Sequence, residues 1–279
     1  MNHIVLIVFD STRYDTFVRA AKPNLMGLGS TQRRFSYASW TPPSHYAMVM
    51  GALPHCGRPG VFAADEHKRD LLSWSERIGV DPASLDLRGF LPRLSLPMFL
   101  RSIGYRSEAF VSLPVINSYT MIAADFDRFE LMPEHNDFGA IIERVRFSDQ
   151  PTFFLLNVGE THYPYTLHGE SSAGMPHLSG LHGVIKRGFT GTGGREDPER
   201  AFAEWCADAN MRRLWEKQIA CVEHLDGLME RMFAKAPAET WFIVTSDHGE
   251  LFGEGGFFGH GPVIHEKVFE VYLVEGRRP

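Results

Sequence analysis

The feature that most constrains this chain is an unbroken apolar run near its start that ends abruptly at an aspartate. Residues 4–9 read IVLIVF, and Asp10 follows directly. A strand that is apolar at every position, rather than at alternate positions, is typical of a sheet covered by helices on both faces. Ligands of such sheets bind outside the carboxyl ends of the strands. Asp10 is therefore predicted to lie at a ligand-binding edge.

Similar patterns recur along the chain. Residues 152–158 form a second apolar run, and residues 107–112 and 240–245 have the composition of strands. Apolar residues at spacings of three and four predict helices over 96–103 and over 214–232. Strands that alternate with helices predict an α/β fold with a mostly parallel central sheet and helices on both faces.

The length of the chain fits one large α/β domain. Its 279 residues, 44% of them hydrophobic, can bury a substantial core. Two stretches, 55–91 and 165–200, fit the alternation poorly, and loops of that length are uncommon unless they are functional or disordered. We interpret both as insertions in a single domain that spans 1–279.

Charge and cysteine content narrow the classes of partner. The net charge of −6 comes without long runs of either sign, so nothing indicates nucleic-acid binding or a membrane surface. The run at 4–9 is too short for a signal-peptide core or a membrane span. Cys56, Cys206 and Cys221 form neither a disulfide framework nor a zinc pattern. We expect a cytoplasmic protein with no nucleic-acid or membrane partner, and a homo-oligomer is compatible with the sequence.

Potential metal ligands follow three of the predicted strands. They are Asp10, Glu160, His162, Asp247 and His248. Carboxylate and imidazole groups are common ligands of divalent metals. An isolated Asp at a strand end is more often a cap or turn residue, so the argument for a metal depends on the set as a whole.

A threonine in a proline-containing segment is the candidate nucleophile. Residues 40–45 read WTPPSH, and the apolar stretch 46–50 behind them could begin a helix. A hydroxyl at a helix N-terminus lies among free backbone N–H groups, which favour an anion such as phosphate. Thr41 alone is unreactive at neutral pH, so it needs a metal or a base to activate it.

Five motifs, in order over most of the chain, resemble the sulfatase branch of the alkaline phosphatase superfamily. They are 4–15 (ending in DSTRYD), 40–51 (beginning WTPPSH), 125–129 (DFDRF, after GYR at 104–106), 161–165 (THYPY) and 245–250 (TSDHGE, with GHG at 259–261). The resemblance implies an alkaline-phosphatase-like core. Because the chain ends at Pro279, soon after the last motif, it also implies that the large C-terminal subdomain of bigger relatives is missing.

The resemblance assigns a first metal site. Asp10, Asp247 and His248 would bind one divalent ion, with Thr41 as fourth ligand and attacking group. Relatives with calcium-binding cages tend to carry paired aspartates and an Asp-Asn ending, whereas here His248 follows Asp247. An imidazole ligand shifts the expected ion toward zinc or manganese, as one ion or two.

The resemblance also implies roles around that site. His162 and His260 would contact the phosphoryl oxygens or the leaving group, or would hold a second metal together with Glu160. Glu160 could instead only orient His162. Arg13 and His45 are further candidates to bind the substrate anion.

Threonine at position 41 decides which branch of the superfamily is the better analogue. Typical sulfatases carry at this position a Cys or Ser that is converted to formylglycine, which threonine cannot form. They also carry an arginine four residues later, where this chain has His45. The pattern is closer to phosphodiesterases, phosphonate monoester hydrolases and phosphoethanolamine transferases. We expect a hydrolase of phosphate or phosphonate esters that acts on a small intracellular substrate through phosphorylated Thr41. The alternatives are a phosphoryl or phosphoethanolamine-type transferase, an atypical sulfatase and a non-catalytic metal-binding scaffold.

Overall fold

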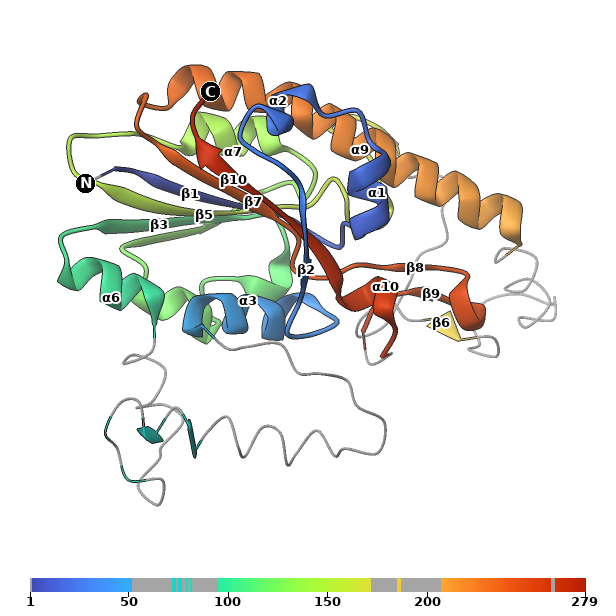
Figure 1. Ribbon diagram of the computed structural model, residues 1–279, viewed down its shortest axis with the longest axis horizontal. Helices are drawn as coiled ribbons and strands as arrows, with labels where there is room; N and C mark the ends of the chain where they lie inside the picture. Colours follow the sequence, from blue (N-terminus) through green and yellow to red (C-terminus); the bar gives the residue numbers. More distant parts are fainter. Residues whose placement is uncertain are drawn as a thin grey trace.

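A seven-stranded sheet forms the centre of the molecule in the computed structural model (Figure 1). The structure describes residues 2–51, 95–171, 207–261 and 264–279, six positions between 72 and 81, and the backbone of 185–186. The strand order is β2-β10-β7-β1-β5-β3-β4. The strands are β1 (Ile4–Phe9), β2 (Gln32–Phe35), β3 (Arg106–Val111), β4 (Arg128–Leu131), β5 (Thr152–Val158), β7 (Trp241–Thr245) and β10 (Glu270–Arg277).

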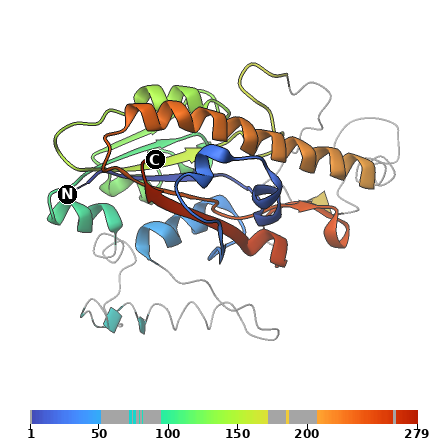
Figure 2. The same cartoon turned by 45° about the horizontal axis from the view of Figure 1, so that its top comes forward.

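Helices cover both faces of this sheet, as the two views show (Figures 1 and 2). One face carries α1 (Tyr14–Arg19), α2 (Pro23–Met26), α7 (Phe138–Arg144) and α9 (Asp208–Lys235). The other face carries α3 (Thr41–Met50) and α6 (Leu96–Ser102). A short helix, α10 (Glu266–Phe269), leads into β10, and a small second sheet has the order β6-β9-β8. Its strands are β6 (Ile185–Lys186), β8 (Leu251–Phe252) and β9 (Phe257–Gly259).

The unbroken apolar character of β1 has a direct cause. Val5, Ile7 and Phe9 point into the core beneath α9 and α7, whereas Val8 packs in the core on the α3 and α6 side. Ile4 and Leu6 also pack against that second core. Because both faces of the strand are covered, every residue along it is apolar.

The predicted architecture is confirmed in its central part. The predicted strands form parallel neighbours in the order β7, β1, β5, β3. The helices predicted over 96–103 and 214–232 correspond to α6 and to the larger part of α9. β10 and β2 add an antiparallel edge that the apolar runs did not predict. Strands at an edge bury less surface, so β2 is mostly exposed and carries no apolar run.

Several sequence predictions fall on residues outside the described ranges. These include nearly all of the insertion at 55–91, most of that at 165–200, and Cys56 and Cys206. The single-domain organisation therefore stays a prediction. Cys221 is a buried free cysteine of α9. Within the described ranges, none of the helices combines the length and the apolar character needed to cross a membrane.

Candidate active site

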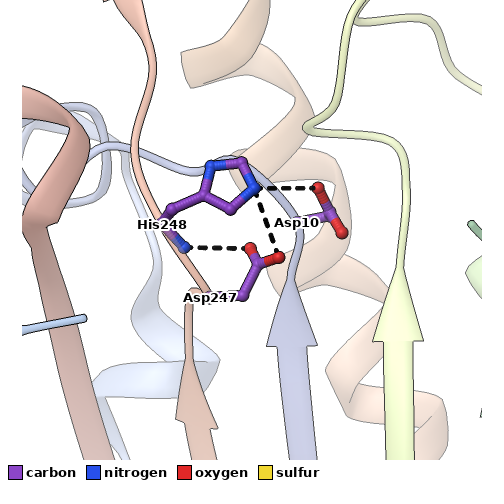
Figure 3. Close-up of side chains that lie close together, drawn as sticks. All are labelled: Asp10, Asp247 and His248. Atoms are coloured by element: carbon purple, nitrogen blue, oxygen red, sulfur yellow. Dashed lines mark hydrogen bonds and ion pairs between the residues drawn. The ribbon is translucent and has the colours of Figure 1, made fainter. Parts of the chain in front are cut away.

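Two adjacent strands bring three buried side chains together at the carboxyl edge of the sheet. Asp10 follows β1, and Asp247 and His248 follow β7, its parallel neighbour. One potential ligand atom from each residue lies within 4.8 Å of the other two. His248 Nε2 lies 3.9 Å from Asp10 Oδ1 and 3.3 Å from Asp247 Oδ2 (Figure 3). The convergence follows from the parallel pairing, which places both strand ends at one edge.

Backbone contacts hold the two strand ends in register. The amides of Ser11 and His248 donate to Asp247 Oδ1 at 3.1 and 3.0 Å. Nδ1–H of His248 donates to the carbonyl of Gly249 at 2.9 Å, so Nε2 is the nitrogen left to act as a metal ligand. A Cβ at Gly249 would lie 2.0 Å from the carbonyl oxygen of Lys267, which leaves room only for glycine.

Thr41 is the first residue of α3 and joins this cluster. Its Oγ1 lies 3.3 and 3.4 Å from the two carboxylate oxygens of Asp10 and 3.3 Å from His248 Nε2. The helix thus begins at Thr41 itself, five residues before the apolar stretch that suggested it. Pro42 and Pro43 suit the first turn because the amides there have no partner within the helix.

The four residues fit a divalent cation. Asp10 and Asp247 are fully buried, and Asp247 Oδ2 has no hydrogen-bond partner. Burial, together with the charge of Asp10, raises the pKa of Asp247 well above its ordinary value. Burial would raise the pKa of Asp10 as well, but nearby His162, His248 and His45 and the Asn157 amide lower it to about 2. A buried pair of carboxylates with an open oxygen, an imidazole nitrogen and a hydroxyl is a suitable donor set for zinc or manganese.

Asn157 supports Asp10 and is absent from the sequence-based set. Its Nδ2–H donates to Asp10 Oδ2 at 2.9 Å, and its Oδ1 accepts from the amides of Ser112 and Leu113. The signal in the sequence is an amide inside the apolar run TFFLLNV. In a fully buried strand such a group needs partners, and here they belong to the site.

The two predicted catalytic histidines lie beside the cluster. The ring centroid of His260 is 4.3 Å from that of His248 and 5.3 Å from that of His162. Nδ1 of His260 is hydrogen-bonded to Glu250 Oε1 at 3.0 Å. Burial raises the pKa of Glu250 to about 7, although His162, His248 and the Tyr165 hydroxyl favour its charged form. Glu250 and Tyr165 lie in the motifs TSDHGE and THYPY, but neither is among the predicted site residues.

Glu160 does not join His162 and His260. Its Oε1 accepts the amide of Phe138, the first residue of α7, at 2.7 Å, and burial raises its pKa to about 7. His162 instead donates from Nδ1 to its neighbour's carbonyl, that of Tyr163. Over the described residues, Asp10, Asp247 and His248 are the one group close enough to hold a metal, so the predicted second metal set is not assembled there.

The two candidate substrate-binding residues are engaged elsewhere. The guanidinium of Arg13 pairs with Asp15 at 2.6 Å and with Glu254 at 2.6 Å, rather than turning its charge toward a substrate anion. His45 is fully buried within α3, and its Nδ1–H donates to the Thr41 carbonyl at 2.9 Å. The structure therefore places His45 one helical turn from Thr41, hydrogen-bonded to its backbone, and Arg13 in an ion-pair network.

Comparison with known proteins identifies the fold. No family model matches the sequence, and no curated protein matches it. The zinc-complexed C-terminal periplasmic domain of EcEptC from Escherichia coli matches with a TM-score of 0.61 at 12% identity, over 99% of this chain and 73% of that one. The phosphonate monoester hydrolase of Agrobacterium radiobacter matches with a TM-score of 0.58 at 15% identity, over 99% and 68%. A protein of the alkaline phosphatase superfamily from Vibrio parahaemolyticus matches with a TM-score of 0.51 at 14% identity, over 99% and 60%.

The chain therefore has an alkaline phosphatase/sulfatase-like fold, as its motifs predicted. Other structures that share the fold are phosphoethanolamine transferases and a sulfatase. The expected cytoplasmic location gains no support from these neighbours, because several of them are periplasmic domains.

Proposed function

We propose that this chain is a metal-dependent hydrolase of phosphate or phosphonate esters with Thr41 as its nucleophile. One observation carries the proposal: the Thr41 hydroxyl lies at the start of a helix and within 3.4 Å of both a carboxylate and an imidazole of the buried cluster. A structural threonine has no need of a carboxylate and an imidazole as fully buried neighbours, with an open carboxylate oxygen beside them. The fold is shared with a phosphonate monoester hydrolase, which supports the same chemistry.

A resident ion would be held by Asp10, Thr41, Asp247 and His248. Bound there, zinc or manganese would lower the pKa of the Thr41 hydroxyl and offset charge on the phosphoryl oxygens. Asp10 and Asp247 supply the negative charge that such an ion requires, and Asn157 fixes the orientation of Asp10. The donor set favours zinc or manganese, and the number of ions is open to measurement.

The reaction at Thr41 has two displacements. The Thr41 hydroxyl releases its proton to solvent, and Oγ1 forms a bond to phosphorus while the bond to the leaving oxygen breaks. This gives phosphorylated Thr41 and an alcohol whose oxygen has taken up a proton from solvent. Water then attacks the same phosphorus, and the bond to Oγ1 breaks. The imidazoles of His162 and His260 lie beside the cluster, where they can bind phosphoryl oxygens.

A transferase is the second candidate, because several proteins of the same fold are phosphoethanolamine transferases. Both reactions share the first displacement and differ in whether water or an alcohol acts in the second. Product analysis in the presence of an added alcohol separates them, since a transferase yields a new ester and a hydrolase yields free acid. Aryl sulfates test the remaining enzymatic alternative, an atypical sulfatase.

The experiment is metal analysis combined with turnover of aryl phosphate monoesters, diesters and phosphonates. We expect one to two equivalents of zinc or manganese, activity in wild type, and loss of turnover by roughly three orders of magnitude or more in Thr41→Ala. Thr41→Ser should retain measurable activity because it keeps a hydroxyl at the same place. Thr240→Ala is a matched control, since Thr240 is buried at the opposite end of β7.

Two results would overturn the proposal. A metal-replete wild type that turns over none of these esters would favour the scaffold alternative. Equal activity of wild type and Thr41→Ala would show that the threonine is not the nucleophile.

A further inference from the structure

A buried glutamine interrupts the apolar face of the long helix α9. Gln218 is 0% exposed, and the other buried residues of this helix are apolar apart from Asp226 and the thiol of Cys221. α9 covers one face of the sheet and extends past the edge at which β1 and β5 end (Figure 1). A buried amide without partners is costly, so the hydrogen bonds of Gln218 indicate what it does there.

The two ends of the Gln218 amide face different groups. Nε2–H donates to the carbonyl of Ser11 and to the carbonyl of Thr161, each at 3.0 Å. Oε1 accepts the Thr16 hydroxyl at 2.8 Å. Because carbonyl oxygens only accept, the end of the side chain that faces two of them must be the amino group. Its hydrogens therefore join the loop after β1 to the loop after β5.

The two joined loops are also bonded to each other. The Thr161 hydroxyl donates to the carbonyl of Asp10 at 2.7 Å. Together with the bonds of Gln218, this contact closes a ring that runs through α9 and both loops. Neither loop can shift without breaking a buried hydrogen bond, and the two loops carry Asp10 and His162.

Ser11 connects Gln218 to the predicted metal ligands. Its φ of 61° lies in the left-handed region, which is unfavourable for a residue with a Cβ. In this conformation its amide donates to Asp247 Oδ1 at 3.1 Å and its hydroxyl to Asp10 Oδ1 at 3.0 Å. One strained residue thus contacts both carboxylates of the cluster, and Gln218 holds its carbonyl.

We propose that Gln218 is a positioning residue that holds Asp10 and Asp247 at the separation the metal requires. The inference rests on the proposed function and adds to it a residue that lies outside every sequence motif. Ligand atoms of the two carboxylates lie within 4.8 Å of each other, and without an ion between them the charges repel. Loops that were free to move apart would have to be brought back when the ion binds, at a cost in affinity. The bonds of Gln218 lower that cost because they hold both loops before the ion arrives.

The test is the zinc affinity of the full chain, measured by competition with a chromogenic chelator. Gln218→Leu removes the hydrogen bonds and keeps a side chain of similar size, so zinc binding should weaken about 10- to 100-fold. Asp226→Leu is the matched control, because it makes the same replacement on α9 but breaks bonds to the amides of Asn24 and Leu25. Its zinc affinity should stay within about threefold of wild type. Urea unfolding of the chelated variants measures how much stability each has lost.

Two further readouts separate positioning from a general loss of stability. The visible absorption bands of bound cobalt depend on the arrangement of its ligands, so Gln218→Leu should shift them and Asp226→Leu should not. Thr161→Val keeps the side-chain shape, removes the bond to the Asp10 carbonyl, and should weaken zinc binding about three- to tenfold. If both residues act through one ring of bonds, the loss in Gln218→Leu/Thr161→Val should be smaller than the product of the single losses.

Equal zinc affinities and equal cobalt spectra in Gln218→Leu and Asp226→Leu would overturn the inference. If Gln218→Leu fails to fold, Thr161→Val decides the question, and an unchanged zinc affinity in that variant would overturn the inference. A wild type that binds zinc but has no turnover dependent on Thr41 would overturn the proposed function alone, because the comparison of zinc affinities still stands. A wild type that binds no zinc would overturn both.

Discussion

Replacing Asp247 by asparagine should remove metal binding and, in the metal-free protein, should not weaken the fold. Asp247 Oδ1 accepts two backbone amides, which the asparagine oxygen can keep. The atom that changes is Oδ2, which is buried without a hydrogen-bond partner near the carboxylate of Asp10. The substitution therefore removes a buried charge and none of the hydrogen bonds that hold the loop.

The magnitude follows from the separation of the two carboxylates. Ligand atoms of Asp10 and Asp247 lie within 4.8 Å of each other. Two full charges at that distance repel by about 3 kcal/mol at an effective dielectric constant of about 20. Apoprotein of Asp247→Asn should thus be as stable as wild type or up to about 3 kcal/mol more stable.

The pH dependence has a defined sign. Burial and Asp10 raise the folded-state pKa of Asp247 above its ordinary value of 3.8. Above that value the unfolded chain releases a proton that the folded chain retains, so the stability of metal-free wild type falls as the pH rises. Asparagine has no such proton, and the advantage of the variant should be present at pH 8 and absent below about pH 3.

The assay is urea unfolding of chelated and zinc-loaded proteins. Zinc at about a hundred times its Kd should stabilise wild type by about 3 kcal/mol, and Asp247→Asn should lose that gain. Asp226→Asn is a control: Asp226 is buried in α9, accepts the amides of Asn24 and Leu25, and lies outside the cluster. It should cost about 1 kcal/mol and leave the zinc response intact. A chelated Asp247→Asn less stable than wild type at pH 8, or one that keeps the zinc response, would refute the reasoning.

Three further predictions concern residues around the site. Burial raises the pKa of Glu160 from 4.5 to about 7, so Glu160 should contribute on the order of 3 kcal/mol to the loss of stability of chelated wild type as the pH rises across that window. In Glu160→Gln the fall in stability between pH 5 and pH 8, measured by urea unfolding, should be smaller by that amount than in wild type. Gly249→Ala places a Cβ 2.0 Å from the Lys267 carbonyl oxygen and should lower Tm by several degrees together with zinc affinity; calorimetry with and without zinc measures both. Asn157→Ala removes the amide that orients Asp10 and should weaken zinc binding about 10- to 100-fold in a competition titration with a chromogenic chelator, and unchanged affinity would contradict that role.

Local patterns were sufficient to predict the centre of the fold and the sheet edge at which the predicted metal ligands lie. The apolar run of β1 predicts a strand covered on both faces, and a parallel strand covered in this way ends at a ligand-binding edge. Because Asp10, Asp247 and His248 each follow such a strand, their positions in the sequence predict that they lie at one edge of the sheet. The proline-containing segment likewise predicted that Thr41 lies near a helix N-terminus.

The hydrogen-bond and ion-pair partners of the polar side chains, by contrast, do not follow from local patterns. Arg13 and Glu254 form an ion pair across 241 positions, and Tyr165 reaches Glu250 across 85. Nothing in the residues adjacent to Arg13 distinguishes a guanidinium aimed at a substrate from one held by two carboxylates. Glu160, predicted beside His162, instead binds the first amide of α7.

There is a physical reason why the elements could be predicted from the sequence and the side-chain partners could not. Strands, helices and the ends of strands follow from the period of apolar residues over a few positions, which the order of amino acids determined by itself. Which carboxylate meets which imidazole depends on how separate elements pack, and on which buried groups find partners there. Only the tertiary structure, by bringing the loops after β5, β7 and β9 to one edge, decided that Glu250 rather than Glu160 is hydrogen-bonded to an active-site histidine candidate, His260.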